Sequence, residues 1–406
     1  MVYNDRFINH EDGLNIIDQM VKTNKLLGAK IRSDLDMSTI NWSKLEGFAH
    51  EGVFGDVFEY GDQFVDKWKD TATNTEYAYP WQLSAIRDVT LHDGEVLKNR
   101  PVLGLHYAHA FGVQFSHQRA FLACPDGLPA GAYHFTIESG WGSNVKAGDI
   151  VRFVTTQDVP AGGRVSGCYG APDVAKSGWR IYTHSADGKT VIETITPTFE
   201  AVEGDTDLGI QKNNTRVGNL NSTQEMAYGW NRWKTSALRQ YLNSDKGVGQ
   251  WWTAQDGWDI APDELKTKAG FLTGLPEDLK AIMKATKVVT YANTVNDGGV
   301  EDVTYDKVFI PSLEEMYVNP QIKGEGEAHE YYKRKAGTTS PLAQYGTYPQ
   351  MITYAVENHT SAQYVRLRSA SRGYAYKAWV VYSSGTVGDD GGVASYAWRF
   401  CPLIVI

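Results

Sequence analysis

The chain has 406 residues, of which 42% are hydrophobic and 12% aromatic, enough for the cores of two or three domains. Its net charge of −9 disfavours nonspecific binding to nucleic acid or anionic membranes, because such surfaces need clustered Lys and Arg. Mean hydropathy is −0.39, no apolar run approaches the ~20 residues of a membrane helix, and no basic-then-apolar segment opens the chain, so neither membrane insertion nor a secretory signal is predicted.

An N-terminal helix is predicted for residues 10–35, within an N-terminal segment that spans residues 1–56. Apolar side chains recur there at helical spacing, in a stripe made of Leu14, Ile17, Val21, Leu26, Leu27 and Ile31. So short a segment does not bury this stripe alone. It either packs on the next domain or joins copies of itself in a bundle, and we favour self-association.

The region 57–209 has the pattern of a β domain. Short stretches alternate apolar and polar residues, and turn dipeptides such as Asp93-Gly94 and Asp187-Gly188 separate them. Many short strands with frequent turns are typical of an antiparallel β-sandwich or a jelly roll. The polar, acidic stretch 197–209 then predicts a domain boundary before residue 210.

Helices and strands alternate in residues 210–406. A helix is predicted from Asn231 to Leu242, two more begin near Pro262 and Pro276, and the stretch after Pro311 is predicted as a strand end followed by a helix. A further helix should close at Gly337. Three strands are predicted at the end of the chain, in the stretches "QYVRLRS", "YKAWVVYS" and "YAWRFCPLIVI".

Four segments of this region carry a family resemblance: "NRWKTSALRQYLNS", "DKVFIPSLEEMY", "YVRLRSAS" and "WRFCPLIVI". Together they resemble the C-type-lectin-like domain of phage and prophage variable proteins, the targets of diversity-generating retroelements. The resemblance implies an α+β fold in which a lectin-like ligand-binding domain, residues 210–406, follows the β-sandwich or jelly-roll-like region and the N-terminal helix.

The same resemblance implies a function without catalysis. It suggests a tail-associated, receptor-binding protein of a phage or prophage, found in the virion or in the host cytoplasm before assembly. Its ligand would be a protein or glycan of the host surface. With the apolar stripe of the N-terminal helix, the resemblance also suggests a homotrimer, because several weak sites acting together bind one surface strongly.

The Gly-rich stretch between the last strands holds the candidate binding residues. Tyr, Trp, Ser, Gly and Asp dominate antibody paratopes, since aromatic rings supply rigid contact area and small polar groups adapt to a partner. The candidates are Ser371, Tyr374, Tyr376, Lys377, Trp379, Tyr382, Ser384, Asp389, Asp390, Ser395 and Tyr396. A core strand pair is the competing interpretation, because alternation turns about half of these residues inward.

Two arginines beside this stretch are predicted to be scaffold instead. Strand alternation places Arg366 and Arg368 on one face, opposite Val365 and Leu367. Arg368 adjoins Ser369 at the start of the loop, so its guanidinium is expected to donate to backbone carbonyls.

Metal sites find little support, and no cofactor is predicted. His106, His109 and His117 lie close in sequence, but no HExxH pattern or Cys pair accompanies them, so hydrogen-bonded or surface histidines are favoured over a zinc site. Calcium is the remaining alternative. Residues 293–306 are rich in Asn and Asp, yet their register does not fit an EF-hand, the signatures of calcium-dependent lectins are absent, and an exposed turn explains them.

Two other functions stay open at this point. A bacterial surface adhesin of the same architecture is disfavoured by the missing signal. An enzyme on a fold like that of the formylglycine-generating enzyme would need cysteine chemistry, but Cys401 falls in a predicted buried strand with no second Cys nearby. The odd, sparse set of Cys124, Cys168 and Cys401 also argues against a disulfide framework and suits a reducing cytosol.

Overall fold

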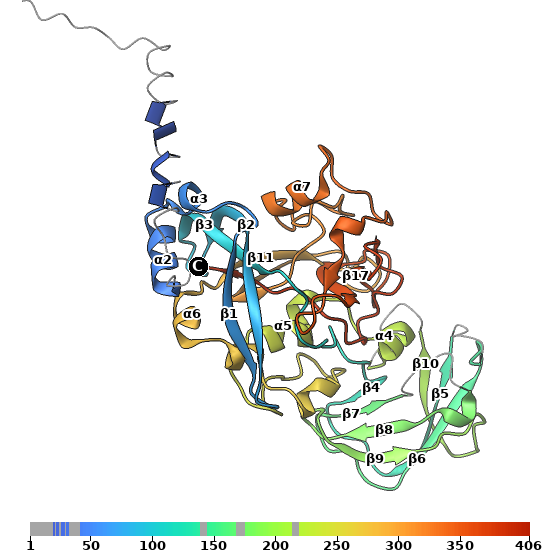
Figure 1. Cartoon of the computed structure of the whole chain (residues 1–406). Helices are drawn as coiled ribbons and strands as arrows, with labels where there is room; N and C mark the ends of the chain where they lie inside the picture. The colour runs from blue at the N-terminus through green and yellow to red at the C-terminus, as the bar shows by residue number, and fades with distance from the viewer. Residues whose placement is uncertain are drawn as a thin grey trace, which may run out of the picture.

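The structure is a computed structural model that describes residues 41–138, 144–167, 175–212 and 219–406, with scattered residues between 19 and 31 (Figure 1). Helices and strands mix in it, and the sheets are mostly antiparallel, which confirms the predicted α+β class. In the described part of the chain, no helix combines the length and the apolar character needed to cross a membrane.

A five-stranded antiparallel sheet forms the centre of the larger unit. Its order is β1-β2-β3-β19-β13, with β1 Gln63–Asp70, β2 Thr75–Thr90, β3 Val96–Leu105, β19 Leu403–Val405 and β13 Val308–Phe309. Strand β19 pairs with β3 on one side, Val405 opposite Val102, and with β13 on the other, Val308 opposite Ile404. The final strand therefore lies inside the sheet, as predicted.

This sheet corrects the predicted domain division at residues 56/57, where the β domain was expected to begin. Residues 63–105 were assigned to the β domain, but they share a sheet and one hydrophobic core with the C-terminal segments. In that core Trp81 and Leu103 lie in the same cluster as Phe309 and Ile404, all almost fully buried. Alternation in a sequence predicts a strand but not the sheet that it joins, and β19 lies far along the chain from β3.

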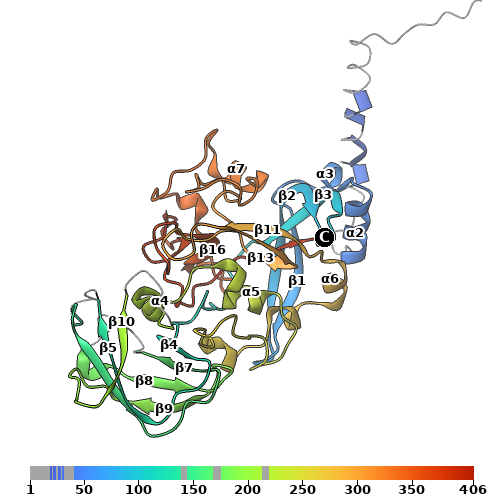
Figure 2. The same ribbon diagram turned by 180° about the vertical axis from the view of Figure 1, so that it is seen from behind.

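The β domain is instead an insertion of two packed sheets (Figures 1 and 2). One sheet has the order β10-β5-β6 and the other β4-β7-β8-β9. Phe121, Phe135 and Val165, from both sheets and the entry to β4, share a separate core. The strands are β4 Leu122–Cys124, β5 Gly131–Ile137, β6 Ile150–Thr155, β7 Gly163–Ser166, β8 Ile181–His184, β9 Val191–Ile195 and β10 Thr206–Gln211.

The insertion leaves and rejoins the larger unit at adjacent points. The Asn221 amide donates to the Phe121 carbonyl at 3.2 Å, and the Ala123 amide donates to the Asn219 carbonyl at 3.4 Å. Helix α4, Thr223–Tyr228, follows the return, and the side chain of Ser222 caps it by accepting from the Glu225 amide.

Short helices surround the central sheet: α2 Trp42–His50, α3 Phe54–Val57, α5 Ala237–Leu242, α6 Glu277–Ile282 and α7 Glu330–Ala336. Helix α7 ends at Gly337 in the left-handed conformation, as predicted. The helix predicted from residue 231 to 242 is split into the 3₁₀ turn Trp233–Thr235 and α5, because Ser236 is extended and caps α5. After Pro311 the structure has turns where a helix was predicted, and the segment after Pro262 is the 3₁₀ turn Asp263–Lys266.

The remaining strands pair locally. The antiparallel hairpin of β11 Thr286–Tyr291 and β12 Glu301–Asp306 precedes the small pair β14 Thr353–Tyr354 and β15 Ala362–Gln363. A three-stranded sheet then carries the predicted binding stretch. Its strands are β16 Val365–Ala370, β17 Ala378–Val381 and β18 Val387–Gly388. Three further 3₁₀ turns are Lys176–Gly178, Phe271–Gly274 and Pro349–Met351.

The N-terminal helix is described only in part. The described residues between 19 and 31 are helical, and in Figure 1 they extend beyond α2 and α3. Met20, Leu26 and Leu27 are 61%, 73% and 55% exposed, whereas Ile31 packs against the main core. The other predicted stripe residues, Leu14, Ile17 and Val21, lie outside the described residues.

Candidate ligand-binding face

The turn between β16 and β17, residues 371–377, is held from beneath by one buried amide. Asn231 Nδ2 donates to the carbonyls of Tyr374 and Lys377, each at 2.7 Å, and to that of Ser371 at 3.2 Å. Asn293 in turn donates to Asn231 Oδ1 at 3.0 Å, which fixes the orientation of the Asn231 amide. A turn held at three carbonyls presents its side chains with little conformational freedom left to lose on binding.

The loop after β18 is held by a buried arginine. Arg366 donates to the carbonyls of Gly392 at 2.6 Å, Val393 at 2.7 Å and Tyr396 at 3.2 Å. No carboxylate pairs with it among the described residues, and burial lowers its pKa to about 9. A Cβ at Gly392 would overlap the Ala378 carbonyl oxygen, so this loop packs against β17 only with glycine there.

Arg368 confirms the scaffold role predicted for it. Its guanidinium donates to the carbonyls of Ile310, at 2.7 Å, and Glu325, and it pairs with the Glu315 carboxylate. Val365 and Leu367, on the opposite face of β16, pack in a separate apolar cluster. The predicted alternation is therefore present.

The predicted binding residues divide into three groups by exposure. Tyr374, Ser384, Asp390 and Tyr396 are exposed, and Tyr376, Lys377, Tyr382 and Ser395 are half-buried. Ser371, Trp379 and Asp389 are buried at 1%, 0% and 1% exposure. The expectation that Trp379 stands on the outside is wrong, because β17 is covered on both faces and the indole packs beside Leu367 and Val381.

The accessible rings form two neighbouring groups, which we call the aromatic face. In the first, Tyr376 stacks on Tyr228 at 4.8 Å between ring centroids and meets Tyr374 edge-on at 5.8 Å. In the second, Tyr364 stacks on Trp398 at 4.5 Å and contacts Tyr382, while Tyr396 meets Trp398 at 5.7 Å. The Ser395 amide donates to the Tyr228 carbonyl at 2.8 Å, which joins the two groups.

Sequence reasoning missed part of this face. Tyr228, Tyr364 and Trp398 contribute rings, and Tyr345, 54% exposed, donates to the buried Asp389 carboxylate at 2.9 Å beside Trp379. Tyr364 and Trp398 flank the candidate stretch, so widening the window would have found them. Tyr228 and Tyr345 come from distant segments, and no local pattern in the sequence points to them.

Charge on the face is low and largely paired. Lys377 lies 4.1 Å from the centroid of the Tyr374 ring and 3.3 Å from the Asp390 carboxylate. Partial burial opposes the ammonium charge, yet Tyr376 and Asp390 raise the pKa of Lys377 above its ordinary value. Rings with hydroxyl groups and one cation suit contact with a partner by stacking and hydrogen bonding.

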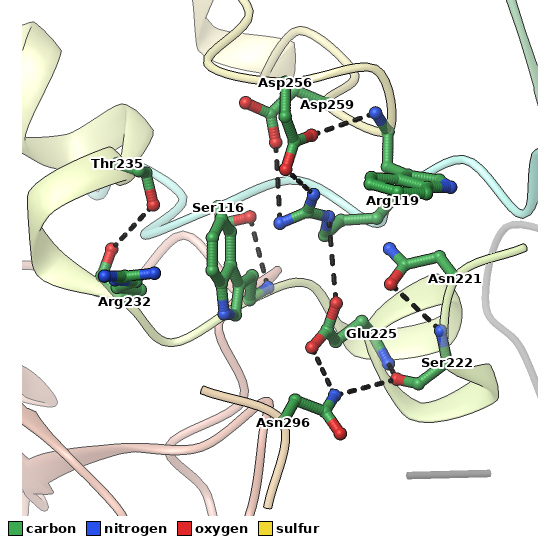
Figure 3. Close-up of polar contacts among 12 residues, drawn as sticks. Ser116, Arg119, Asn221, Ser222, Glu225, Arg232, Thr235, Asp256, Asp259 and Asn296 are labelled. Atoms are coloured by element: carbon green, nitrogen blue, oxygen red, sulfur yellow. Dashed lines mark hydrogen bonds and ion pairs between the residues drawn. The ribbon is translucent and has the colours of Figure 1, made fainter. Parts of the chain in front are cut away.

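A second cluster of polar side chains lies where the insertion meets the larger unit (Figure 3). Arg119 is fully buried over the Trp230 ring at 4.2 Å and faces three carboxylates, those of Glu225, Asp256 and Asp259. Asn296 Nδ2 donates to Glu225 at 2.5 Å. One guanidinium faces three carboxylates, so the cluster has an excess of negative charge, and burial raises the pKa of Asp259. We interpret it as a structural junction between the two units.

The Asn- and Asp-rich stretch 293–306 belongs to the same junction. Asp297 Oδ2 accepts from Trp230 Nε1 at 2.7 Å and from Asn293 Nδ2 at 2.6 Å, and Asp302 pairs with Arg232. Protein donors thus occupy the oxygens that calcium would need. Within the described ranges, no cluster of three or more His, Cys, Asp or Glu side chains is arranged to hold a metal ion, and calcium stays an alternative to the prediction of no cofactor.

The three histidines of the predicted zinc alternative have separate partners. His109 lies between the hydroxyls of Tyr79, at 2.5 Å, and Tyr241, at 3.0 Å. His106 contacts Gln82 Oε1 at 2.6 Å, and His117 contacts the Gln118 carbonyl at 2.9 Å. They serve as local hydrogen-bonding groups of the core and its edge.

Cys401 is 5% exposed, and burial raises the pKa of its thiol to about 12. A thiol with so high a pKa is a poor nucleophile, because the thiolate is the reactive form.

Comparison with known proteins identifies one similarity. Residues 208–404 match a domain family described as a domain of unknown function, DUF6273. Neither the curated proteins nor the solved structures contain a match to the chain. The matched segment includes β13 and the first two residues of β19 but not β1–β3, so the central sheet is completed by residues outside the region of similarity.

Proposed function

We propose that this chain is a receptor-binding, tail-associated protein of a phage or prophage, with a C-type-lectin-like domain that presents the aromatic face to a host-surface protein or glycan. We further propose that the exposed positions of this face vary under a diversity-generating retroelement. The observation that carries the proposal is the contrast between accessible rings and their buried supports, Asn231 and Arg366.

Physical chemistry favours this assignment over a passive surface. Clustered exposed aromatic rings are uncommon on soluble chains and usually mark an interaction site. Hydrogen bonds to main-chain carbonyls hold the turn and the loop whatever side chains stand on them. Replacement of Tyr374 or Tyr396 therefore leaves the support intact, which a variable face requires.

A cell-binding assay tests the binding role. Fluorescently labelled protein is applied to a panel of bacterial isolates, and Tyr374→Ala and Tyr396→Ala are compared with wild type on any isolate bound. We expect at least ten-fold weaker binding, since an anchor ring is worth ~2 kcal/mol or more, with melting temperatures almost unchanged. Tyr354→Ala on β14, an exposed tyrosine outside the aromatic face, is the matched surface control. Variants that bind as wild type would remove the face from recognition.

Sequencing tests the variable role independently. The codons for residue 231 and residues 364–400 are read in many related phage or prophage genomes. We expect substitutions at the exposed positions and a constant Asn at 231 and Arg at 366, with a reverse transcriptase gene and an imperfect repeat nearby. Uniform variation across exposed and buried positions would refute retroelement targeting. Neighbouring tail genes would favour the virion role over a bacterial adhesin.

We also propose a homotrimer assembled through the N-terminal helix. Met20, Leu26 and Leu27 expose apolar side chains that a lone helix would leave in water. Light scattering at micromolar concentration should give three times the chain mass, and Leu26→Glu with Leu27→Glu should reduce it to one. A monomeric wild-type protein would contradict the assembly.

A further inference from the structure

A polar pocket of about 430 Å³ lies on the larger unit and shares no residue with the aromatic face. The end of β2 (residues 86–90), strand β11 (287–289) and the loop 324–327 surround it, and Glu315 and Arg368 lie at its base. The volume falls in the range of small-molecule sites, about 300–1,000 Å³.

Charged side chains of both signs line the base of the pocket. Glu315 is almost fully buried and pairs with two arginines, Arg368 and, at 3.1 Å, Arg87. Burial alone would raise the Glu315 pKa, but these two cations lower it to about 2. Two guanidinium groups thus share one ionised carboxylate, and Lys287 adds a third cation to a lining that also holds Asp88, Glu325 and Glu327.

The neighbouring Glu325 is a second buried carboxyl beside Arg368. Its carboxyl is buried and accepts from the Tyr291 amide at 3.0 Å and from the Ser369 hydroxyl. Burial raises the Glu325 pKa above its ordinary value, so the carboxyl is held partly by neutral donors and ionises less readily than a free one.

Arg87 uses only part of its hydrogen-bonding capacity within the described residues. In the described part of the chain, its guanidinium pairs only with Glu315, through Nη1, although an arginine has five N–H donors. The side chain is 18% exposed and lines the pocket, so a ligand in the pocket can reach its remaining donors. A partly desolvated guanidinium binds carboxylates strongly, because its planar fork matches both oxygens.

The pocket is preformed. Glu314 accepts the amides of Gly324 and Glu325 at 2.8 and 2.9 Å, which holds the loop 324–327 in place. Gly326 has a φ of +137°, and a Cβ there would lie 2.7 Å from Glu315 Oε1, so the loop can lie against Glu315 only with glycine. Val289 supplies an apolar wall, on the same face of β11 as Lys287.

We propose that this pocket binds a small organic monocarboxylate, whose carboxylate pairs with Arg87 and whose body lies against Val289. The remaining donors of Arg87 match the two oxygens of one carboxylate. A phosphate dianion fits less well, because the rim also carries the carboxylates of Asp88 and Glu327.

Calorimetry on the full chain tests the proposal with matched probes. Hexanoate is compared with hexanamide, glucuronate with glucose, and inorganic phosphate is titrated alone. We expect at least one carboxylate to bind saturably at one site, and its neutral counterpart to bind at least ten-fold more weakly. Hexanoate against glucuronate separates an aliphatic from a hydroxylated body. Carboxylates that bind no better than their neutral counterparts, or more weakly than phosphate, would overturn the proposal.

Variants place the binding in this pocket. Arg87→Gln should weaken the bound carboxylate ten-fold or more, and Arg87→Lys should restore part of it. Lys67→Gln on β1, an exposed lysine paired with Glu76, is the control and should bind as wild type. Because loss of Arg87 also affects the buried Glu315, Val289→Trp fills the pocket without touching the ion pair and should abolish binding. Folded Arg87→Gln and Val289→Trp proteins with unchanged affinity would refute the site.

Discussion

Substitution of Ile404 in the central strand should destabilise the larger unit severely. Ile404 is 0% exposed and pairs with Leu103 on one side and Val308 on the other. Ile404→Ala removes three carbons, about 2.4 kcal/mol at ~0.8 kcal/mol per buried carbon, before the cavity is counted. The measured range for such a change is ~2–5 kcal/mol, a large share of a typical 5–15 kcal/mol stability.

Ile210 is the matched control, because it is the same residue on the inserted sandwich with 48% exposure. Ile210→Ala should cost under ~0.5 kcal/mol. Thermal unfolding by circular dichroism should show the main transition of Ile404→Ala lowered by roughly 4–20 °C and that of Ile210→Ala nearly unchanged. Deletion of residues 403–406, all fully buried, should abolish the transition. Equal transitions for the two alanine variants would refute the placement of β19 inside the sheet.

Three further predictions concern the supports of the fold. Burial lowers the pKa of His329 from 6.5 to about 3, so its contribution to the free energy of unfolding is full above pH 6.5 and is lost as the pH falls toward 3. Between pH 7.5 and 5.0, urea unfolding should show that wild type loses about 2 kcal/mol more of this free energy than His329→Gln does. Equal losses would contradict the burial of a neutral His329. Asn231→Ala leaves three turn carbonyls without their donor at a cost of ~1–3 kcal/mol, and limited proteolysis should then cut residues 371–377 faster than in wild type. Gly392→Ala should destabilise the protein by ~1–3 kcal/mol because the new Cβ would overlap the Ala378 carbonyl, whereas Gly373→Ala, with open space around it, should not. Thermal unfolding distinguishes the two variants, and equal melting temperatures would refute the close packing of the loop.

The sequence predicted local structure better than it predicted which strands pair in a sheet. Gly337 ended its helix and Arg368 donated to carbonyls, because cap chemistry and strand alternation are local properties. The boundary predicted at residues 56/57 is wrong because β1–β3 belong with a strand some three hundred residues later. Hydrophobic periodicity contains no information on which strands pair across such a separation.

The candidate face was predicted in outline and missed in detail. Trp379 and Tyr374 stand in the same aromatic stretch, yet one is completely buried and the other 41% exposed. The difference comes from the two-sided burial of β17, which depends on Tyr345 and Leu367 from other segments. An alternating pattern predicts one buried face, and it fails where both faces of a short strand are covered.

The position of β19 also has a consequence for the order in which the chain is made. Strands β1, β2 and β3 leave the ribosome early, but the edge of β3 that pairs with β19 stays open until the whole insertion and the aromatic face have been synthesised. An open strand edge is a template for wrong pairing. The nascent chain therefore passes through a long interval in which the inserted sandwich, with its own core, can fold while the larger unit cannot. Expression yield should thus depend on translation rate and on chaperones that cover the β3 edge.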